Sequence, residues 1–138
     1  MDKHTATSVL NFEGYKVEKI RFDINDNFDA DDVTVDIKFD IRNNIDKENR
    51  TLKVILEVNI FNDCIENNKP FSLEVSIIGF YRFDDKVDEN ILQGLVKSNA
   101  VAILYPYLRS LVSVITSNSG FPTIILPTIN VNKLMNKE

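Results

Sequence analysis

The sequence has very little of what catalysis and metal binding require. It contains one cysteine, Cys64, one histidine, His4, and no tryptophan among its 138 residues. A catalytic triad would have to be built on His4, near a chain end, where polypeptides are usually poorly ordered. Cys64 lies beside Asp63 and close to Glu66, and neighbouring carboxylates disfavour the reactive thiolate. These residues are also too few for a zinc site, so the sequence predicts neither an enzyme nor a metal-binding protein.

Glycine-rich loops and basic clusters are missing as well. The chain has four glycines, all isolated, and therefore no phosphate-binding loop of the kind that holds a nucleotide. The acidic cluster Asp29–Asp32 lacks the spacing of a calcium-binding EF-hand loop. A net charge of −5 with scattered Lys and Arg argues against nucleic acid and against anionic lipid. We therefore expect no cofactor, no nucleic-acid partner and no attraction to a membrane surface.

Long hydrophobic stretches are also lacking. The longest, Ala100–Ile115, is interrupted by Pro106 and Arg109, and a transmembrane helix needs about 20 apolar residues. The first residues lack the apolar region of a secretory signal. A chain of this length can bury one core of ordinary size. We therefore expect a single domain over residues 1–138 that does not insert into a membrane and stays in the cytoplasm.

What the sequence does have is apolar alternation, in four segments. Apolar residues or glycine fill every second position in Val33–Ile41, Leu52–Ile60 and Phe71–Phe83, which is the pattern of half-buried strands. Tyr15–Ile24 alternates too, but its parity slips at Glu18-Lys19, as a β-bulge would cause. The segments between and after them are short, polar and rich in Asn and Asp: Asn25–Asp32, Arg42–Arg50, Asn62–Pro70 and Asp84–Asn90. Such connections favour an antiparallel sheet, because a parallel pair needs a long crossover.

After Asn90 the apolar period changes to that of an α-helix. Proline has no amide hydrogen and restricts the residue before it, so this main helix either begins near Tyr105 or is kinked at Pro106. Gly120 suits the left-handed residue that ends a helix. One face of the helix is apolar: Val101, Leu104, Tyr105, Leu108, Leu111, Val112 and Ile115.

Together with the strands, the helical C-terminal part of the sequence predicts an α+β fold class. Two prolines keep residues 121–129 extended, and a short second helix is expected from Val131 onward. The main helix is apolar on more than this one face, which we call the stripe, since Ala100, Ala102, Ile103 and Val114 lie outside it. A helix that covers a sheet usually keeps a polar outer face. The sequence therefore predicts burial of this helix from two sides, through self-association.

The C-terminal third contains two linked motifs. One is Ile103-Leu-Tyr-Pro-Tyr-Leu-Arg109, and the other is Gly120-Phe-Pro-Thr-Ile-Ile-Leu-Pro-Thr-Ile-Asn130. They resemble the SecB family of protein-export chaperones, whose members show Ile-Leu-Phe-Pro-Tyr-x-Arg, then Gly-x-Phe/Leu-Pro, then Leu-x-Pro-hydrophobic-Asn at matching intervals. Looser matches at Ile20–Asp23 and Phe71–Val75 extend the resemblance over most of the chain.

The resemblance implies both a fold and a function. The fold would be a four-stranded antiparallel sheet with one long helix and a short C-terminal helix, assembled as a homotetramer, a dimer of dimers. The function would be that of an ATP-independent holdase, which binds non-native polypeptides in hydrophobic grooves and delivers preproteins to the SecA motor. Such grooves make physical sense, because a large apolar patch on a soluble protein marks a partner site.

The resemblance also implies three groups of site residues. In the family, clients contact the second strand, the extended segment after the main helix and the second helix. The matching residues are Ile37, Phe39, Ile41, Phe121, Ile124, Leu126, Val131, Leu134 and Met135. Acidic residues of the outer sheet face dock SecA, and Asp23 and Glu74 match two of them. The oligomer interface would include Leu104, Tyr105, Leu108, Leu111, Val112 and Ile115. Ordinary core packing is the competing interpretation of Ile37 and Ile41, and surface solvation that of the two acids.

Two departures from the family leave the partner open. Lys19 stands where the family has an acidic residue, and the sequence ends at Glu138, without the family's acidic tail and with room for only a short second helix. SecB-like proteins also act as chaperones for antitoxins of toxin–antitoxin systems, a role that needs no SecA. A chaperone dedicated to an antitoxin is therefore the alternative to an export holdase. A purely structural oligomerising domain and an enzyme are further alternatives.

Overall fold

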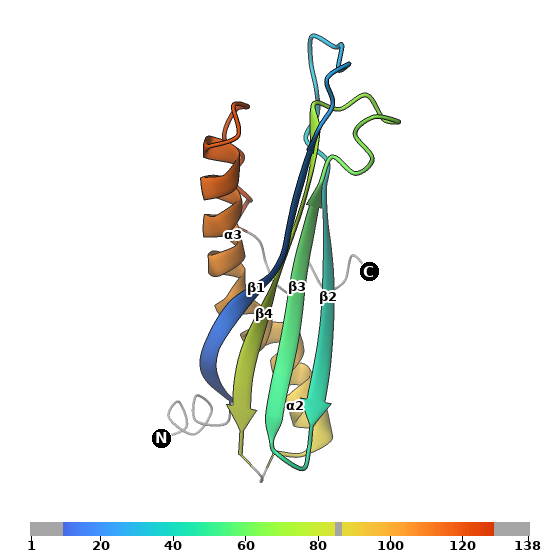
Figure 1. Ribbon diagram of the computed structural model, residues 1–138. Helices are drawn as coiled ribbons and strands as arrows, with labels where there is room; N and C mark the ends of the chain where they lie inside the picture. Colours follow the sequence, from blue (N-terminus) through green and yellow to red (C-terminus); the bar gives the residue numbers. More distant parts are fainter. Residues whose placement is uncertain (1–9, 85–86, 129–138) are drawn as a thin grey trace.

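Four strands form one antiparallel sheet. The computed structural model of the chain describes residues 10–84 and 87–128. The strands are β1 (Leu10–Ile24), β2 (Ile37–Asp46), β3 (Thr51–Ile60) and β4 (Phe71–Phe83), and they lie in the order β1-β4-β3-β2 (Figure 1). Every neighbouring pair is antiparallel, which confirms the prediction made from the short polar loops. β4 has the predicted bounds.

β1 contains two irregularities in its pairing with β4. The register shifts between Val17 and Lys19, where the parity of the apolar residues slips in the sequence, so the predicted bulge is confirmed. A second shift lies between Phe12 and Gly14, and Gly14 has a φ of 128°. Residues with a side chain rarely adopt this conformation, which explains why glycine stands at the second irregularity.

β2 begins later in the chain than the alternation predicted. The expected strand was Val33–Ile41, whereas β2 begins at Ile37. Its start is set by its partner β3, which ends at Ile60. The amide of Phe61 still donates a hydrogen bond to the carbonyl of Asp36 at 3.0 Å, and beyond that point β3 offers no further partner. The alternation of residues 33–36 is therefore real, but these residues have no strand to pair with.

β2 also continues further than predicted, because residues 42–46 were assigned to a loop. These residues pair with β3 as far as Asp46, which lies opposite Thr51. The turn that follows is fixed by the carboxylate of Asp46, which accepts hydrogen bonds from the amide and the side chain of Asn49 at 3.1 and 2.8 Å. Asn43 and Asn44 resemble turn residues by composition, but on an edge strand both side chains remain exposed.

One long helical run follows β4. It consists of α2 (Glu89–Leu95), the π-helical turn η1 (Val96–Ala100) and α3 (Val101–Ser117). The carboxylate of Asp88 caps α2 by accepting a hydrogen bond from a backbone amide of the first turn at 2.9 Å. Shortly after the end of α3, Gly120 has a φ of 90°, the left-handed conformation predicted for the helix end.

Pro106 lies inside α3, so the predicted alternative of a helix start near Tyr105 is wrong. Because proline has no amide hydrogen, the carbonyl of Ala102 loses its helical partner. Ala102 and Pro106 are both exposed, so water can bond this carbonyl instead. The short helix expected from Val131 onward lies outside the described residues.

α3 packs on one face of the sheet and closes the core. Leu104, Leu108 and Val112 on α3 are 0% exposed. The hydroxyl of Tyr81, on β4, donates a hydrogen bond to the carbonyl of Ala100 in the π-helical turn at 2.6 Å. Burial raises the pKa of Tyr81, which keeps this hydroxyl protonated as a donor. The sheet contributes alternating residues of its two central strands: Leu52, Val54, Leu56, Val58, Ile60, Phe71, Leu73, Val75, Ile77, Tyr81 and Phe83.

Gly79 is expected to be sensitive to substitution, because α3 approaches β4 closely there. A Cβ at this position would lie 2.9 Å from Cε1 of Tyr81 and 3.0 Å from Cδ1 of Leu104. Gly79→Ala is therefore expected to lower the free energy of unfolding by about 1–3 kcal/mol through overpacking. Gly94→Ala is the matched control: nothing lies within 4 Å of its added Cβ on α2, so stability should stay equal or rise by up to about 1 kcal/mol. Urea unfolding followed by circular dichroism measures both.

Candidate binding surfaces

β2 presents apolar side chains beside a free strand edge. Ile37, Phe39 and Ile41 lie opposite buried residues of β3 and are themselves half-buried against the core. The ring centroid of Phe39 lies 5.9 Å from that of Tyr105 on α3. Because β2 is the last strand of the described sheet, its outer N–H and C=O groups have no strand to pair with. An extended polypeptide can add to such an edge and place side chains on the apolar face.

The segment after α3, residues 121–128, is bound back onto the helix and is called the crossover below. The amide of Ile124 donates to Oγ1 of Thr116 at 2.9 Å, and Nε of Arg109 donates to the carbonyl of Leu126 at 2.7 Å. Leu126 is 0% exposed, whereas Ile125, which the sequence did not single out, is 63% exposed. The crossover is thus anchored by one buried leucine and turns a neighbouring isoleucine to solvent.

The crossover begins near one edge strand and ends near the other. At its start, the ring of Phe121 lies 6.3 Å from that of Phe22 on β1. At its end, the hydroxyl of Tyr105 donates a hydrogen bond to the carbonyl of Pro127, and the Tyr105 ring lies beside Phe39 of β2. The structure therefore brings together β2 and the crossover, the two described segments that were expected to contact clients.

Other residues singled out from the sequence lie elsewhere. Val131, Leu134 and Met135 fall outside the described residues. Leu126 is buried in the core and does not reach the surface. The residues expected at an oligomer interface divide into two sets. Leu111 and Ile115 are half-buried, but the other members are at most 7% exposed within this one chain and are not accessible to a second copy: Leu104, Tyr105, Leu108 and Val112.

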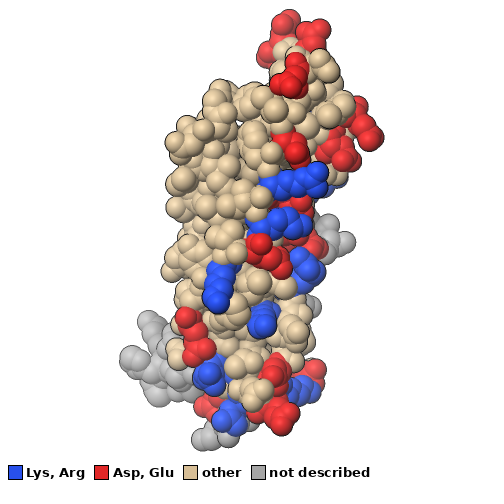
Figure 2. Space-filling model, in the orientation of Figure 1, with Lys and Arg blue, Asp and Glu red and all other residues tan. Residues whose placement is uncertain are grey.

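A different apolar surface is exposed where β1 meets α3. The ring centroids of Tyr15 and Tyr107 lie 4.5 Å apart, and about two fifths of each side chain is exposed. Val17, Ile20 and Val114 are each 46–54% exposed. We call these five residues the β1–α3 surface. Figure 2 shows that the region over α3 is almost free of charged side chains in this view, whereas many charged side chains lie over the strands.

The signal for the β1–α3 surface was present in the sequence. The alternation of β1 predicted a half-buried strand, and the residues of the helix that lie off its apolar stripe predicted burial on a second side. What the sequence did not show was which apolar residues of the helix face the sheet. In the structure the stripe packs against the sheet, Ala100 is buried as well, and Ala102, Tyr107 and Val114 are exposed.

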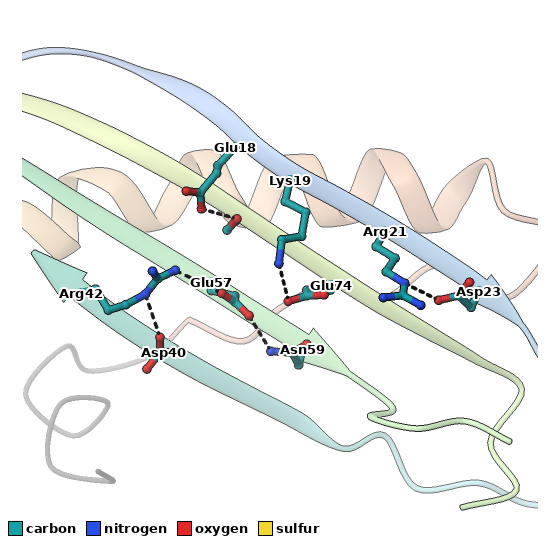
Figure 3. A network of polar contacts seen from close by, with 10 residues as sticks. Glu18, Lys19, Arg21, Asp23, Asp40, Arg42, Glu57, Asn59 and Glu74 are labelled. Carbon is teal, nitrogen blue, oxygen red and sulfur yellow. Dashed lines mark hydrogen bonds and ion pairs between the residues drawn. The ribbon is translucent and has the colours of Figure 1, made fainter. Parts of the chain in front are cut away.

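The sheet face turned away from α3 carries a network of charged side chains (Figure 3). Nζ of Lys19 lies 3.0 Å from Oε2 of Glu74, and Nε of Arg21 lies 2.9 Å from Oδ2 of Asp23. The hydrogen bond from Lys19 lowers the pKa of the Glu74 carboxyl, and the same contact raises the pKa of Lys19. Partial burial raises the pKa of Glu57, next to Glu74 in this network.

The two acids expected to dock SecA are therefore paired within the chain. Glu74 contacts Lys19, the residue that replaces a family acid, and Asp23 contacts Arg21. Surface ion pairs of this kind contribute about 0–1 kcal/mol, so they do not prevent docking. They do offset the charges of these two acids, which weakens their attraction for a basic partner.

Two further features of the described chain concern metal binding and membrane insertion. No group of three or more His, Cys, Asp and Glu residues in the described ranges is arranged to hold a metal ion. The helical run Glu89–Ser117 is long and apolar enough to cross a membrane by length and composition alone. The core helix of a non-membrane protein passes the same test, and α3 packs Leu104 and Leu108 against the sheet.

Known proteins match this chain both in sequence and in fold. The chain is 41% identical over 66 residues to the uncharacterized protein MJ0357 of Methanocaldococcus jannaschii, covering 48% of this chain and 42% of that protein. It is 30% identical over 90 residues to the protein-export protein SecB of Anaplasma phagocytophilum, covering 62% of this chain and 55% of that protein. The chain thus spans about half the length of these curated relatives.

The fold has a solved counterpart. The SecB-like chaperone Rv1957 of Mycobacterium tuberculosis, in complex with a ChAD peptide from the Rv1956 HigA1 antitoxin, matches over 92% of both chains with a TM-score of 0.72 and 14% identity. At this identity the likeness shows the fold alone. The family described as "Preprotein translocase subunit SecB" matches residues 22–138, which is most of the chain. The chain therefore belongs to the SecB family.

Proposed function

We propose that this protein is an ATP-independent chaperone that binds non-native polypeptide along β2 and the crossover. The observation that carries the proposal is the free edge of β2 beside Ile37, Phe39 and Ile41. An unfolded segment offers what this site can bind, namely unpaired backbone groups and apolar side chains. The crossover offers a further exposed apolar side chain, Ile125. Neither kind of contact requires nucleotide hydrolysis.

Suppression of aggregation tests this proposal. A urea-unfolded test protein is diluted into buffer, and light scattering is followed with the chaperone at one tetramer equivalent, in the presence and absence of ATP. Scattering should fall by more than half, equally under both conditions, because binding competes with self-association of the same apolar segments. Unchanged scattering at stoichiometric chaperone would contradict the holdase function and favour a purely structural domain.

An export role is the more specific form of the proposal. The chaperone would keep preproteins unfolded and pass them to SecA, with Asp23 and Glu74 contributing to docking. The name of the Anaplasma phagocytophilum relative, protein-export protein SecB, supports this role. The pairing of both acids with basic residues of the same chain weakens the expected attraction to SecA.

The second candidate is a chaperone dedicated to an antitoxin. It is favoured by the ion pairs of Asp23 and Glu74, and by the fold shared with a chaperone that was solved with an antitoxin peptide. The two roles differ in their genetic context, since a dedicated chaperone is useful only where its antitoxin is made. A toxin–antitoxin pair beside the gene would favour this role, whereas recovery of SecA and many preproteins with the tagged chaperone would favour export.

Self-association is part of the proposed function. The β1–α3 surface exposes five large apolar side chains on a chain that is otherwise well supplied with surface charge (Figure 2). Exposed apolar patches of this kind mark interaction sites. We propose that this surface is covered by a second copy, as part of a homotetramer built as a dimer of dimers.

A further inference from the structure

The sheet face turned away from α3 also carries an apolar patch between two lysines. Ile55 and Ile78 lie directly opposite each other on β3 and β4, and Phe80 follows on the same face. Nζ of Lys16 and Nζ of Lys53 each lie 5.9 Å from the centroid of the Phe80 ring. All three apolar side chains are half-buried. We call these five residues the lysine-flanked patch.

The backbone leaves room beside the Phe80 ring. Gly14 of β1 lies opposite Phe80 in the register of the sheet. An added Cβ at Gly14 would meet no atom within 4 Å, so the space over this residue is open. Any other residue would extend a side chain into this space. The bulge at Gly14 therefore leaves space for a partner's side chain next to Phe80.

The two lysines differ from four other basic residues of this face. Lys19, Arg21, Arg42 and Arg82 each form an ion pair with a carboxylate. Within the described residues the ammonium groups of Lys16 and Lys53 form no ion pair or hydrogen bond, and each lies over the Phe80 ring. Their contact with the ring contributes about 0.5–1 kcal/mol at an exposed site and leaves both ammonium groups free to bind an anion. The patch is thus apolar at its centre and locally positive at its rim, although the whole chain carries a net charge of −5.

We infer that the lysine-flanked patch docks a partner polypeptide that presents an apolar side chain between acidic residues. The apolar side chain would occupy the space over Gly14, and the acidic residues would pair with Lys16 and Lys53. Complementary charges at a rim mainly set specificity and the rate of association. The neighbouring Glu13–Arg82 ion pair carries no net charge, so two separate lysines are left to bind an anion. A polyanion such as nucleic acid needs a continuous basic surface instead.

This inference goes beyond the proposed chaperone function, because the patch and the client site lie on opposite faces of the sheet. Phe39 and Ile41 face α3, whereas Phe80 and Lys53 face away from it. A client and the acidic partner could therefore bind at the same time. The partner peptide is expected to retain its affinity when an unfolded client saturates the other face.

Binding of a designed peptide tests the inference on the full-length protein. The probe is a dye-labelled peptide with Phe and Leu between two pairs of aspartates, and its control has asparagine in place of aspartate. Fluorescence anisotropy should show saturable binding of the first peptide and at least about tenfold weaker binding of the second. The double variant Lys16→Glu/Lys53→Glu should bind the first peptide about tenfold more weakly, since two favourable ion pairs become repulsive.

Lys38→Glu is the matched control. Lys38 lies on β2 and is exposed on the same face of the sheet as the patch, but it does not belong to the patch. This variant should bind the first peptide as tightly as the unmodified protein. Thermal unfolding checks that all three proteins are folded. Equal binding of both peptides, an equal loss in Lys38→Glu, or no loss in the double variant would overturn the inference. So would tighter binding of single-stranded DNA or anionic vesicles than of the aspartate peptide.

Discussion

A chain in which Val17 and Val114 are both replaced by glutamate is expected to be monomeric at concentrations where the unmodified protein forms an oligomer. Both side chains belong to the β1–α3 surface and are about half exposed in the single chain. If a second copy covers them, each glutamate places a carboxylate in an apolar interface, at a cost of several kcal/mol. The dissociation constant should rise by at least about 1,000-fold. Sedimentation velocity over a concentration series measures this change.

The control for this experiment is Ile65→Glu, which introduces the same charge at an apolar side chain that is 74% exposed, on the loop between β3 and β4. It should leave the oligomer intact. Because Val17 and Val114 are solvent-accessible in the single chain, the double variant should keep its circular dichroism spectrum and unfold cooperatively. An unchanged oligomer in the double variant, or an unmodified protein that is monomeric, would contradict the proposed interface.

Much of the sheet could be predicted from the sequence, because alternation reports directly which side chains are buried. β4 has the predicted bounds, and the slip of parity near Lys19 marks the bulge that the register shows. Each of these features depends on the strand's own residues. The same holds for the end of the helix, where the left-handed Gly120 is a local requirement of the chain.

Features that depend on a partner could not be predicted in this way. The limits of β2 are set by where β3 ends and by the turn at Asp46, and composition alone suggested a loop there. The helix is apolar on two sides, and its sequence does not say which side faces the sheet. Leu108 was therefore expected at an oligomer interface, although it lies in the core, and the exposed Tyr107 was not singled out.

The ion pairs on the sheet face turned away from α3 could not be predicted from the sequence either. Lys19 and Glu74 are separated by 55 positions in the sequence, and the register of β1 and β4 brings them together. The sequence showed that a family acid was replaced by lysine, but not that this lysine would neutralise another expected docking residue. Similarly, Lys16 and Lys53 come from different strands and meet only through Phe80, which lies between them.

Replacing Phe39 by aspartate is expected to weaken binding of an unfolded client by at least about tenfold. Phe39 combines three properties of a binding hot spot: an aromatic ring, a half-buried position and contact with a second aromatic ring, that of Tyr105. A carboxylate at this position would lose the apolar contact and would be desolvated by the bound client. Titration of a dye-labelled, carboxymethylated test protein, which cannot refold, measures the affinity by fluorescence anisotropy.

Ile125→Asp on the crossover provides a second test with less risk to the fold, because this side chain is 63% exposed and its removal opens no cavity. It should weaken the binding of the same client by about threefold to tenfold, whereas Ile65→Asp, at a similarly exposed isoleucine on the loop between β3 and β4, should leave the affinity unchanged. Thermal unfolding identifies any variant that has lost its structure. If folded Phe39→Asp and Ile125→Asp both bind the client as tightly as Ile65→Asp, clients do not bind along β2 and the crossover. In that case the β1–α3 surface is the next site to test, and client binding there would compete with assembly.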